Sequence, residues 1–177
     1  FFDFSVDNVL TEKLFADYFK KKNIKDLVVV SPDAGGAKDA KKFADLVGAE
    51  LAIIHKSRPG HNKSEVMHVV GDVEDKCCLL YDDMVDTAGS VCNAIEALKA
   101  KGAKNEIYLC ATHPVFSDPA AERLHKAGFK EVVVANTIPV SEAKQFKGLK
   151  VLSVAPLLAR VIKNVHEGKS VTEAFNK

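Results

Sequence analysis

Short apolar runs rich in β-branched residues alternate along this chain with segments whose apolar residues recur at helical spacing. The run Leu27-Val28-Val29-Val30 contains no polar residue, which is typical of a strand buried on both faces of a parallel sheet. Alternation of this kind predicts an α/β fold with a mostly parallel central sheet flanked by helices. Further strands are expected at residues 51–54, 77–81, 107–111, 132–135 and 151–153. Helices are expected at residues 10–22, 37–46, 89–101, 119–127 and 157–166.

Length and charge narrow the classes of function. The 177 residues suffice for one domain spanning residues 1–177. The 25 Lys and Arg residues nearly balance the 24 Asp and Glu residues, so the charge gives no reason to expect nucleic acid or a membrane surface as partner. No apolar run approaches the roughly 18 residues of a membrane span. Cys77, Cys78, Cys92 and Cys110 form no C-x-x-C pair and are expected to be reduced, mostly buried thiols of a cytoplasmic protein.

The strongest chemical signal is the stretch Tyr81-Asp82-Asp83-Met84-Val85-Asp86-Thr87-Ala88-Gly89-Ser90. An apolar strand is predicted to end in two carboxylates, and a turn of small and hydroxyl residues then opens a helix. Free N–H groups at a helix N-terminus, with hydroxyls beside them, can bind a monophosphate. The paired carboxylates suit a sugar diol or a metal ion. The alternative interpretation is that Asp86 and Thr87 only cap the helix.

Two further segments follow strands of the same predicted sheet. In Ser31-Pro32-Asp33-Ala34-Gly35-Gly36, the two glycines allow the backbone to turn around a pyrophosphate-sized anion, and Asp33 could hold a divalent cation. By itself this pattern is also that of an ordinary turn. In residues 56–63, the cations Lys56 and Arg58 lie in a loop without apolar anchors, which is expected to be mobile from about residue 57 to 64. Because ligands bind at the carboxyl ends of parallel strands, the three segments are expected to converge.

Taken together, these motifs resemble the C-terminal half of the ribose-phosphate pyrophosphokinases, and the resemblance extends over nearly the whole chain. The residue 79–90 stretch resembles that family's phosphoribosyl-binding signature, residues 31–36 its pyrophosphate loop and residues 56–59 its catalytic loop. Further similar segments are Ala111-Thr112-His113-Pro114-Val115, Asn136-Thr137-Ile138-Pro139 and Ser170-Val171-Thr172-Glu173-Ala174-Phe175.

The resemblance implies a type I phosphoribosyltransferase fold and magnesium-dependent transfer of pyrophosphate from ATP to the 1-hydroxyl of ribose 5-phosphate. It implies that Lys56 and Arg58 are catalytic and that Asp33 lies at the magnesium ion. By the same resemblance, the 5-phosphate is bound by Asp86, Thr87, Ala88, Gly89 and Ser90, and the ribose hydroxyls by Asp82 and Asp83. Pyrophosphate is implied to lie along Asp33, Ala34, Gly35 and Gly36.

The chain also departs from the family. The family usually has Arg where Ser57 stands, so the serine removes a positive charge from the catalytic loop. It usually has Thr where Ser90 stands. The family's other half, which supplies most ATP contacts, is not part of this sequence. We therefore expect the chain to work with that half or with a second chain, and to assemble as a homo-oligomer.

Three functions remain open from the sequence. They are the pyrophosphokinase domain, a non-catalytic regulatory relative, and a phosphoribosyltransferase that consumes phosphoribosyl pyrophosphate. The role of His113, at a predicted strand end, is open as well. It could touch the ligand or be a buried histidine bonded to a backbone carbonyl.

Overall fold

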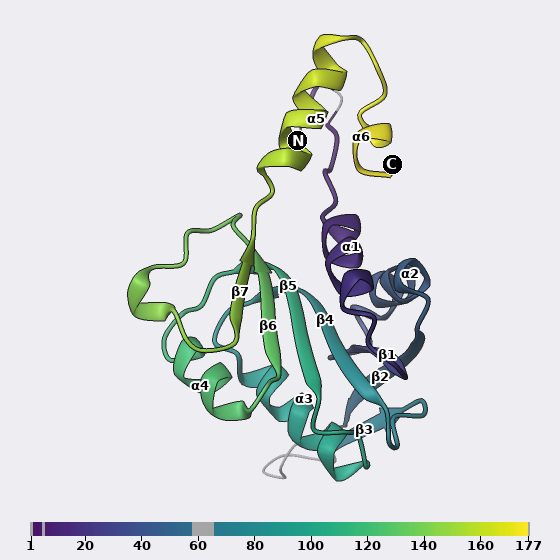
Figure 1. Ribbon diagram of the computed structural model, residues 1–177, viewed down its shortest axis with the longest axis vertical. Coiled ribbons are helices and arrows are strands. Elements are labelled where there is room, and N and C mark those ends of the chain that lie inside the picture. Colours follow the sequence, from purple (N-terminus) through teal and green to yellow (C-terminus); the bar gives the residue numbers. More distant parts are fainter. Residues whose placement is uncertain (1, 5, 58–65, 177) are drawn as a thin grey trace.

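A computed structural model describes residues 2–4, 6–57 and 66–176, and the strands within these ranges form one seven-stranded sheet (Figure 1). The spatial order of the strands is β3-β2-β1-β4-β5-β6-β7, and every neighbouring pair is parallel except β2 and β3. The strands are β1 (Leu27–Ser31), β2 (Glu50–Ser57), β3 (Val66–Val70), β4 (Cys77–Val85), β5 (Ile107–Pro114), β6 (Glu131–Ala135) and β7 (Leu149–Leu152).

Helices cover both faces of the sheet because successive strand residues point to opposite faces. Val29 of β1 packs on one face with Phe15 and Phe43, which come from the first two helices. Val28 packs on the other face with Leu98 and with residues of the fourth helix. The helices are α1 (Glu12–Lys22), α2 (Ala37–Val47), α3 (Gly89–Ala100), α4 (Ala120–Ala127), α5 (Ala155–His166) and α6 (Thr172–Asn176), with a 3-10 turn η1 (Glu142–Lys144).

Every strand and helix expected from the sequence is present, with ends displaced by a few residues. Two features differ from the expectations. Strand β3 (Val66–Val70), which pairs antiparallel with β2 at the sheet edge, was not expected. The strand expected at residues 77–81 continues to Val85, because β5 remains paired beside it as far as Pro114.

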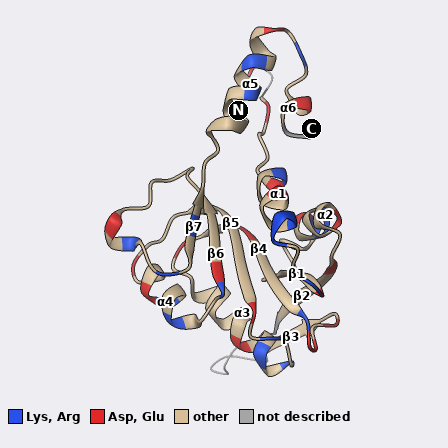
Figure 2. Cartoon of the chain, in the orientation of Figure 1, with Lys and Arg blue, Asp and Glu red and all other residues tan. Residues whose placement is uncertain are grey.

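Helices α5 and α6 project beyond the carboxyl ends of the strands, and the N-terminal segment runs toward α1 from the same side (Figure 1). Arg160 of α5 donates from Nε to the carbonyl oxygen of Ala174 at 3.1 Å, which joins the two helices. Figure 2 shows acidic and basic residues mixed over the helices rather than gathered by sign. Within the described ranges, no helix has the length and apolarity needed to cross a bilayer.

Candidate functional site

The adjacent strands β1 and β4 place two of the predicted segments side by side at the carboxyl end of the sheet. A cavity of about 800 Å³ lies there, closed on one side by the N-terminal segment before α1. The predicted residues Asp33, Gly35, Gly36, Asp82 and Asp83 all line it. Its other described lining residues are Asn8, Val9, Leu10, Thr11, Glu12, Asp39, Lys42, Tyr81, Met84, Thr112 and His113. The turn after β1 and the carboxyl-terminal part of β4 therefore meet at these five residues, as expected.

The turn after β1 is shaped by side chains that bond to its own backbone. Asp33 accepts a hydrogen bond from the Gly36 N–H on Oδ1 at 3.0 Å, and the Ser31 hydroxyl donates to the Asp33 carbonyl oxygen at 2.7 Å. A methyl group on Gly35 would lie 3.2 Å from Asp33 Oδ1, and one on Gly36 would lie 3.1 Å from Ser31 Oγ. A side chain at either glycine would thus press on a polar side chain that shapes the turn.

Asp82 and Asp83 lie inside β4, which extends beyond them to Val85. Asp82 is half-buried and accepts a hydrogen bond from the Asp83 N–H on Oδ1 at 2.9 Å, whereas Asp83 is exposed. Burial is the main cause that raises the pKa of the Asp82 carboxyl to about 7, and the neighbouring charges of Asp83 and Asp33 add to it. A cation or hydroxyl donors from a ligand would favour the ionised form of this carboxyl.

The residue 86–90 loop connects β4 to α3, as expected for a phosphate loop. Ala88 is the residue that precedes the helix, and it has left-handed backbone angles (φ 61°, ψ 8°) without a capping side chain. The interpretation of Asp86 and Thr87 as helix caps is therefore wrong. Asp86, Thr87 and Ser90 are exposed, and the backbone N–H groups of the first turn have no intrahelical acceptor. This loop is outside the lining of the cavity, although it continues the strand that carries Asp82 and Asp83.

The predicted cationic segment is placed only in part. Lys56 was expected in a loop, but its backbone belongs to β2 and pairs with Met67 of β3. Arg58 and most of the segment expected to be mobile lie outside the described residues. Lys56 and Arg58 therefore remain predicted catalytic residues.

Comparisons with known proteins agree with these motifs. Residues 59–176 match the family described as the phosphoribosyl synthetase-associated domain. The chain belongs to this family. It is 47% identical to the ribose-phosphate pyrophosphokinase of Bacillus subtilis over 99% of this chain and 55% of that protein. Ribose-phosphate pyrophosphokinases are thus homologues of this chain. The chain spans about half the length of the curated relatives it matches.

Solved structures agree on the fold. The phosphoribosylpyrophosphate synthetase of Mycobacterium smegmatis superposes with a TM-score of 0.86 at 46% identity, over 94% of this chain and 54% of that one. Orotate phosphoribosyltransferase from Aeropyrum pernix superposes with a TM-score of 0.54 at 19% identity, over 89% of this chain and 75% of that one. The predicted type I phosphoribosyltransferase fold is confirmed.

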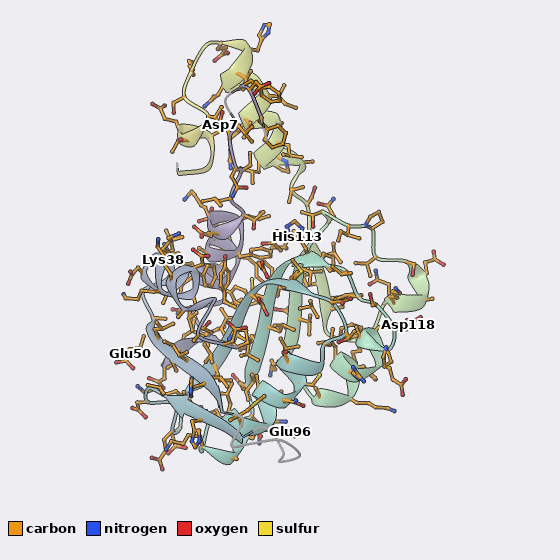
Figure 3. The ribbon with its side chains drawn as sticks, turned by 180° about the vertical axis from the view of Figure 1, so that it is seen from behind. Asp7, Lys38, Glu50, Glu96, His113 and Asp118 are labelled. Atoms are coloured by element: carbon orange, nitrogen blue, oxygen red, sulfur yellow. The ribbon has the colours of Figure 1, made fainter. Side chains whose placement is uncertain are left out.

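A histidine beside the family's motif residues has a defined orientation. His113 is exposed, lines the cavity and lies at the end of the sheet nearest α5 (Figure 3). The Thr137 hydroxyl donates its one hydrogen to the Thr112 carbonyl oxygen at 3.0 Å. His113 Nδ1 lies 2.9 Å from the same hydroxyl, and we assign it as the donor because the hydroxyl hydrogen is directed to the carbonyl. The interpretation of His113 as a buried histidine bonded to a backbone carbonyl is wrong.

Sequence reasoning missed one cation beside the family's phosphoribosyl signature. Arg123 of α4 donates from Nη1 to the carbonyl oxygen of Thr87 at 3.0 Å. Nothing in the sequence distinguishes this arginine from an ordinary surface residue, because 36 residues separate it from Thr87. The contact arises from the packing of α4 beside α3 over the same face of the sheet.

Proposed function

We propose that this chain is the acceptor-binding half of a ribose-phosphate pyrophosphokinase, which transfers pyrophosphate from ATP to the 1-hydroxyl of ribose 5-phosphate. The observation that carries the proposal is that Asp33, Gly35 and Gly36 share one cavity with Asp82 and Asp83. Because the chain is a homologue of these enzymes, we interpret the turn after β1 as the polyphosphate site and the two carboxylates of β4 as ligands of the sugar.

The acceptor side rests on β4 and the loop that follows it. The carboxylates of Asp82 and Asp83 accept hydrogen bonds from the ribose hydroxyls, since ionised carboxylates are acceptors only. The 5-phosphate would bind at the N-terminus of α3, where backbone N–H groups lack intrahelical acceptors, and the side chains of Thr87 and Ser90 supply hydroxyl donors in the same stretch of chain. The remaining residues of this phosphate site are Asp86, Ala88 and Gly89. Because β4 stays paired with β5 as far as Val85, the sugar and phosphate subsites are attached to one continuous, hydrogen-bonded strand.

The donor side rests on the turn after β1, and its charges fit a magnesium ion. The described lining of the cavity holds five carboxylates, from Glu12, Asp33, Asp39, Asp82 and Asp83, against one lysine, Lys42. Lys42 is already paired with Asp39 at 2.7 Å. Polyphosphate would be repelled here unless a cation bound with it. Mg²⁺ commonly takes one or two carboxylates and completes its shell with phosphate and water, which the carboxylates of this lining could provide.

In the proposed reaction, the 1-hydroxyl oxygen bonds to the β-phosphorus of ATP while the bond from that phosphorus to the α–β bridging oxygen breaks. AMP leaves, and the hydroxyl proton is lost. Asp33 would hold Mg²⁺, which neutralises charge on the transferred phosphates, while Ala34, Gly35 and Gly36 follow the pyrophosphate with their backbone. Lys56 and Arg58 would stabilise charge on the transferring group. Such reactions depend mainly on positioning and charge stabilisation.

Exposed apolar side chains on α5 and on the N-terminal segment offer a surface for a partner. The relatives contain a further half that could cover it, since this chain matches 55% of the Bacillus subtilis protein. Leu158, Ile162 and Val165 of α5 are large apolar residues that are exposed, as are Phe2 and Phe4 of the N-terminal segment. Such side chains near one another mark an interaction surface more often than open solvent. We propose that the other half of the enzyme, or further copies in a homo-oligomer, covers them.

The test measures binding and catalysis separately. Isothermal titration with ribose 5-phosphate should show binding by the chain itself, and Asp83→Asn should weaken it at least tenfold. Mg²⁺ and ATP should yield AMP only when an N-terminal half from a relative is added. Binding without AMP in any mixture would favour the non-catalytic regulatory relative. Release of pyrophosphate from phosphoribosyl pyrophosphate with a purine or pyrimidine base would instead favour the phosphoribosyltransferase.

A further inference from the structure

Arg123 and the residue 86–90 loop meet in an arrangement that brings a cation to the proposed phosphate site. Besides the 3.0 Å hydrogen bond to the Thr87 carbonyl oxygen, Arg123 Nη1 lies 3.9 Å from the position of a methyl group built on Gly89. The Thr87 hydroxyl oxygen lies at the same distance, 3.9 Å, from that position. The guanidinium and the hydroxyl thus flank one small space that a side chain at residue 89 would fill.

The hydrogen bond to Thr87 also sets the direction of the next amide. The peptide bond between Thr87 and Ala88 is trans. In a planar trans peptide, the carbonyl oxygen and the following N–H point in opposite directions. Because Arg123 holds the Thr87 oxygen toward α4, the Ala88 N–H points away from α4. In the described part of the chain, neither the Thr87 N–H nor the Ala88 N–H donates a hydrogen bond.

The same contact stabilises an unusual backbone conformation. Ala88 has φ 61°, a left-handed conformation that residues with a Cβ rarely adopt and that must be held by its surroundings. The Ala88 side chain is buried in the core beneath the loop, and Arg123 fixes the peptide before it from the other side. The loop conformation that leaves these N–H groups without a protein acceptor is therefore set partly by a helix outside the motif.

The charge of Arg123 is not neutralised by an ion pair within the described residues. Within the described residues, no carboxylate forms an ion pair with it, whereas its helix neighbour Lys126 is paired with Glu122 at 2.5 Å. Its field reaches the first turn of α3, where it lowers the pKa of the Cys92 thiol against the larger raising effect of burial. A positive charge this close to the loop attracts an anion bound there without having to contact it.

We propose that Arg123 is a positioning residue for the 5-phosphate subsite, which it serves by orienting the Thr87–Ala88 peptide and by adding a positive charge beside it. The inference rests on the proposed function, since it assigns the ligand of this loop as the phosphate of a sugar phosphate. A structural role alone, as a brace between α3 and α4, is the competing explanation.

The experiment compares three variants of the full chain. Arg123→Leu removes both charge and hydrogen bond, Arg123→Lys keeps the charge, and Lys126→Leu removes an equal charge from an exposed position of the same helix. Affinity for ribose 5-phosphate and for inorganic phosphate is measured by calorimetry, and the Ala88 amide is followed by NMR during each titration. Urea unfolding reports whether each variant is folded. If Arg123→Leu does not fold, Arg123→Gln, which is a smaller change and also removes the charge, takes its place.

We expect Arg123→Leu to weaken ribose 5-phosphate binding at least tenfold and to abolish the shift of the Ala88 amide, while the urea midpoint stays near that of Lys126→Leu. Arg123→Lys should recover part of the affinity, and Lys126→Leu should change it less than twofold. Unchanged affinity in a folded Arg123→Leu, or an equal loss in Lys126→Leu, would overturn the inference. If the unaltered chain binds neither ligand, the proposed function itself fails.

Discussion

Replacing Asp82 by Asn should remove a pH dependence of stability that burial of this carboxyl creates. The folded protein raises the pKa of Asp82 from 3.8 to about 7, chiefly by desolvation. A carboxyl with a raised pKa binds its proton more tightly in the folded state, so stability is greatest below about pH 4 and falls as pH rises to about 7. Since one pKa unit corresponds to about 1.4 kcal/mol, the whole fall is at most about 4 kcal/mol.

The Asn variant is a close test because its amide oxygen can still accept the hydrogen bond from the Asp83 N–H. We expect the free energies of unfolding of the two proteins to agree near pH 4 and to diverge up to pH 8. At pH 8 the variant should be more stable by about 2–4 kcal/mol, the lower value allowing for the partial exposure of the carboxyl. The gain in stability should accompany weaker binding of ribose 5-phosphate.

The assay is urea unfolding followed by circular dichroism at several pH values between 4 and 8. Only the difference between the two proteins is interpreted, because all other titrating groups are shared. Glu96→Gln, which neutralises an exposed carboxylate on α3, serves as the control and should leave the pH dependence unchanged. Parallel curves for the unaltered protein and Asp82→Asn would refute the reasoning, because they would mean that folding does not raise this pKa.

Three further expectations follow from local geometry. In urea titrations, Gly71→Ala should destabilise the fold by at least about 2 kcal/mol, because φ is 115° and the new methyl would lie 2.9 Å from a β2 side chain. The control Gly48→Ala, whose new methyl would have open space around it, should cost only about 1 kcal/mol. Phe43→Ala should lower the free energy of unfolding by about 3–5 kcal/mol, since the ring is fully buried and stacked on an aromatic ring of β4. Nitrogen-15 NMR should show neutral His113 protonated on Nδ1, and Thr137→Val should abolish that preference; protonation on Nε2 in the unaltered protein would contradict the assigned hydrogen bonds.

The sequence by itself determined the fold class and the main binding loops. Apolar runs such as the one containing Val29 are read correctly because strand burial depends on local composition and on the two-residue alternation of side chains. The glycines of the turn after β1 are equally local, since the side chains on which a Cβ would press lie within the same short turn. Strand β3 was missed because it is held by pairing with β2, a strand that precedes it in the chain, rather than by a signal within its own residues.

Tertiary structure decided which groups meet at the site and how their chemistry is altered. The pKa of Asp82 depends on burial at the end of a seven-stranded sheet and on charges from another strand's turn, neither of which is encoded near residue 82. The orientation of His113 depends on Thr137, which lies 24 residues away. Arg123 reaches Thr87 only because α3 and α4 cover the same face of the sheet, so its contribution follows from long-range packing, whereas the motif it supports is continuous in the sequence.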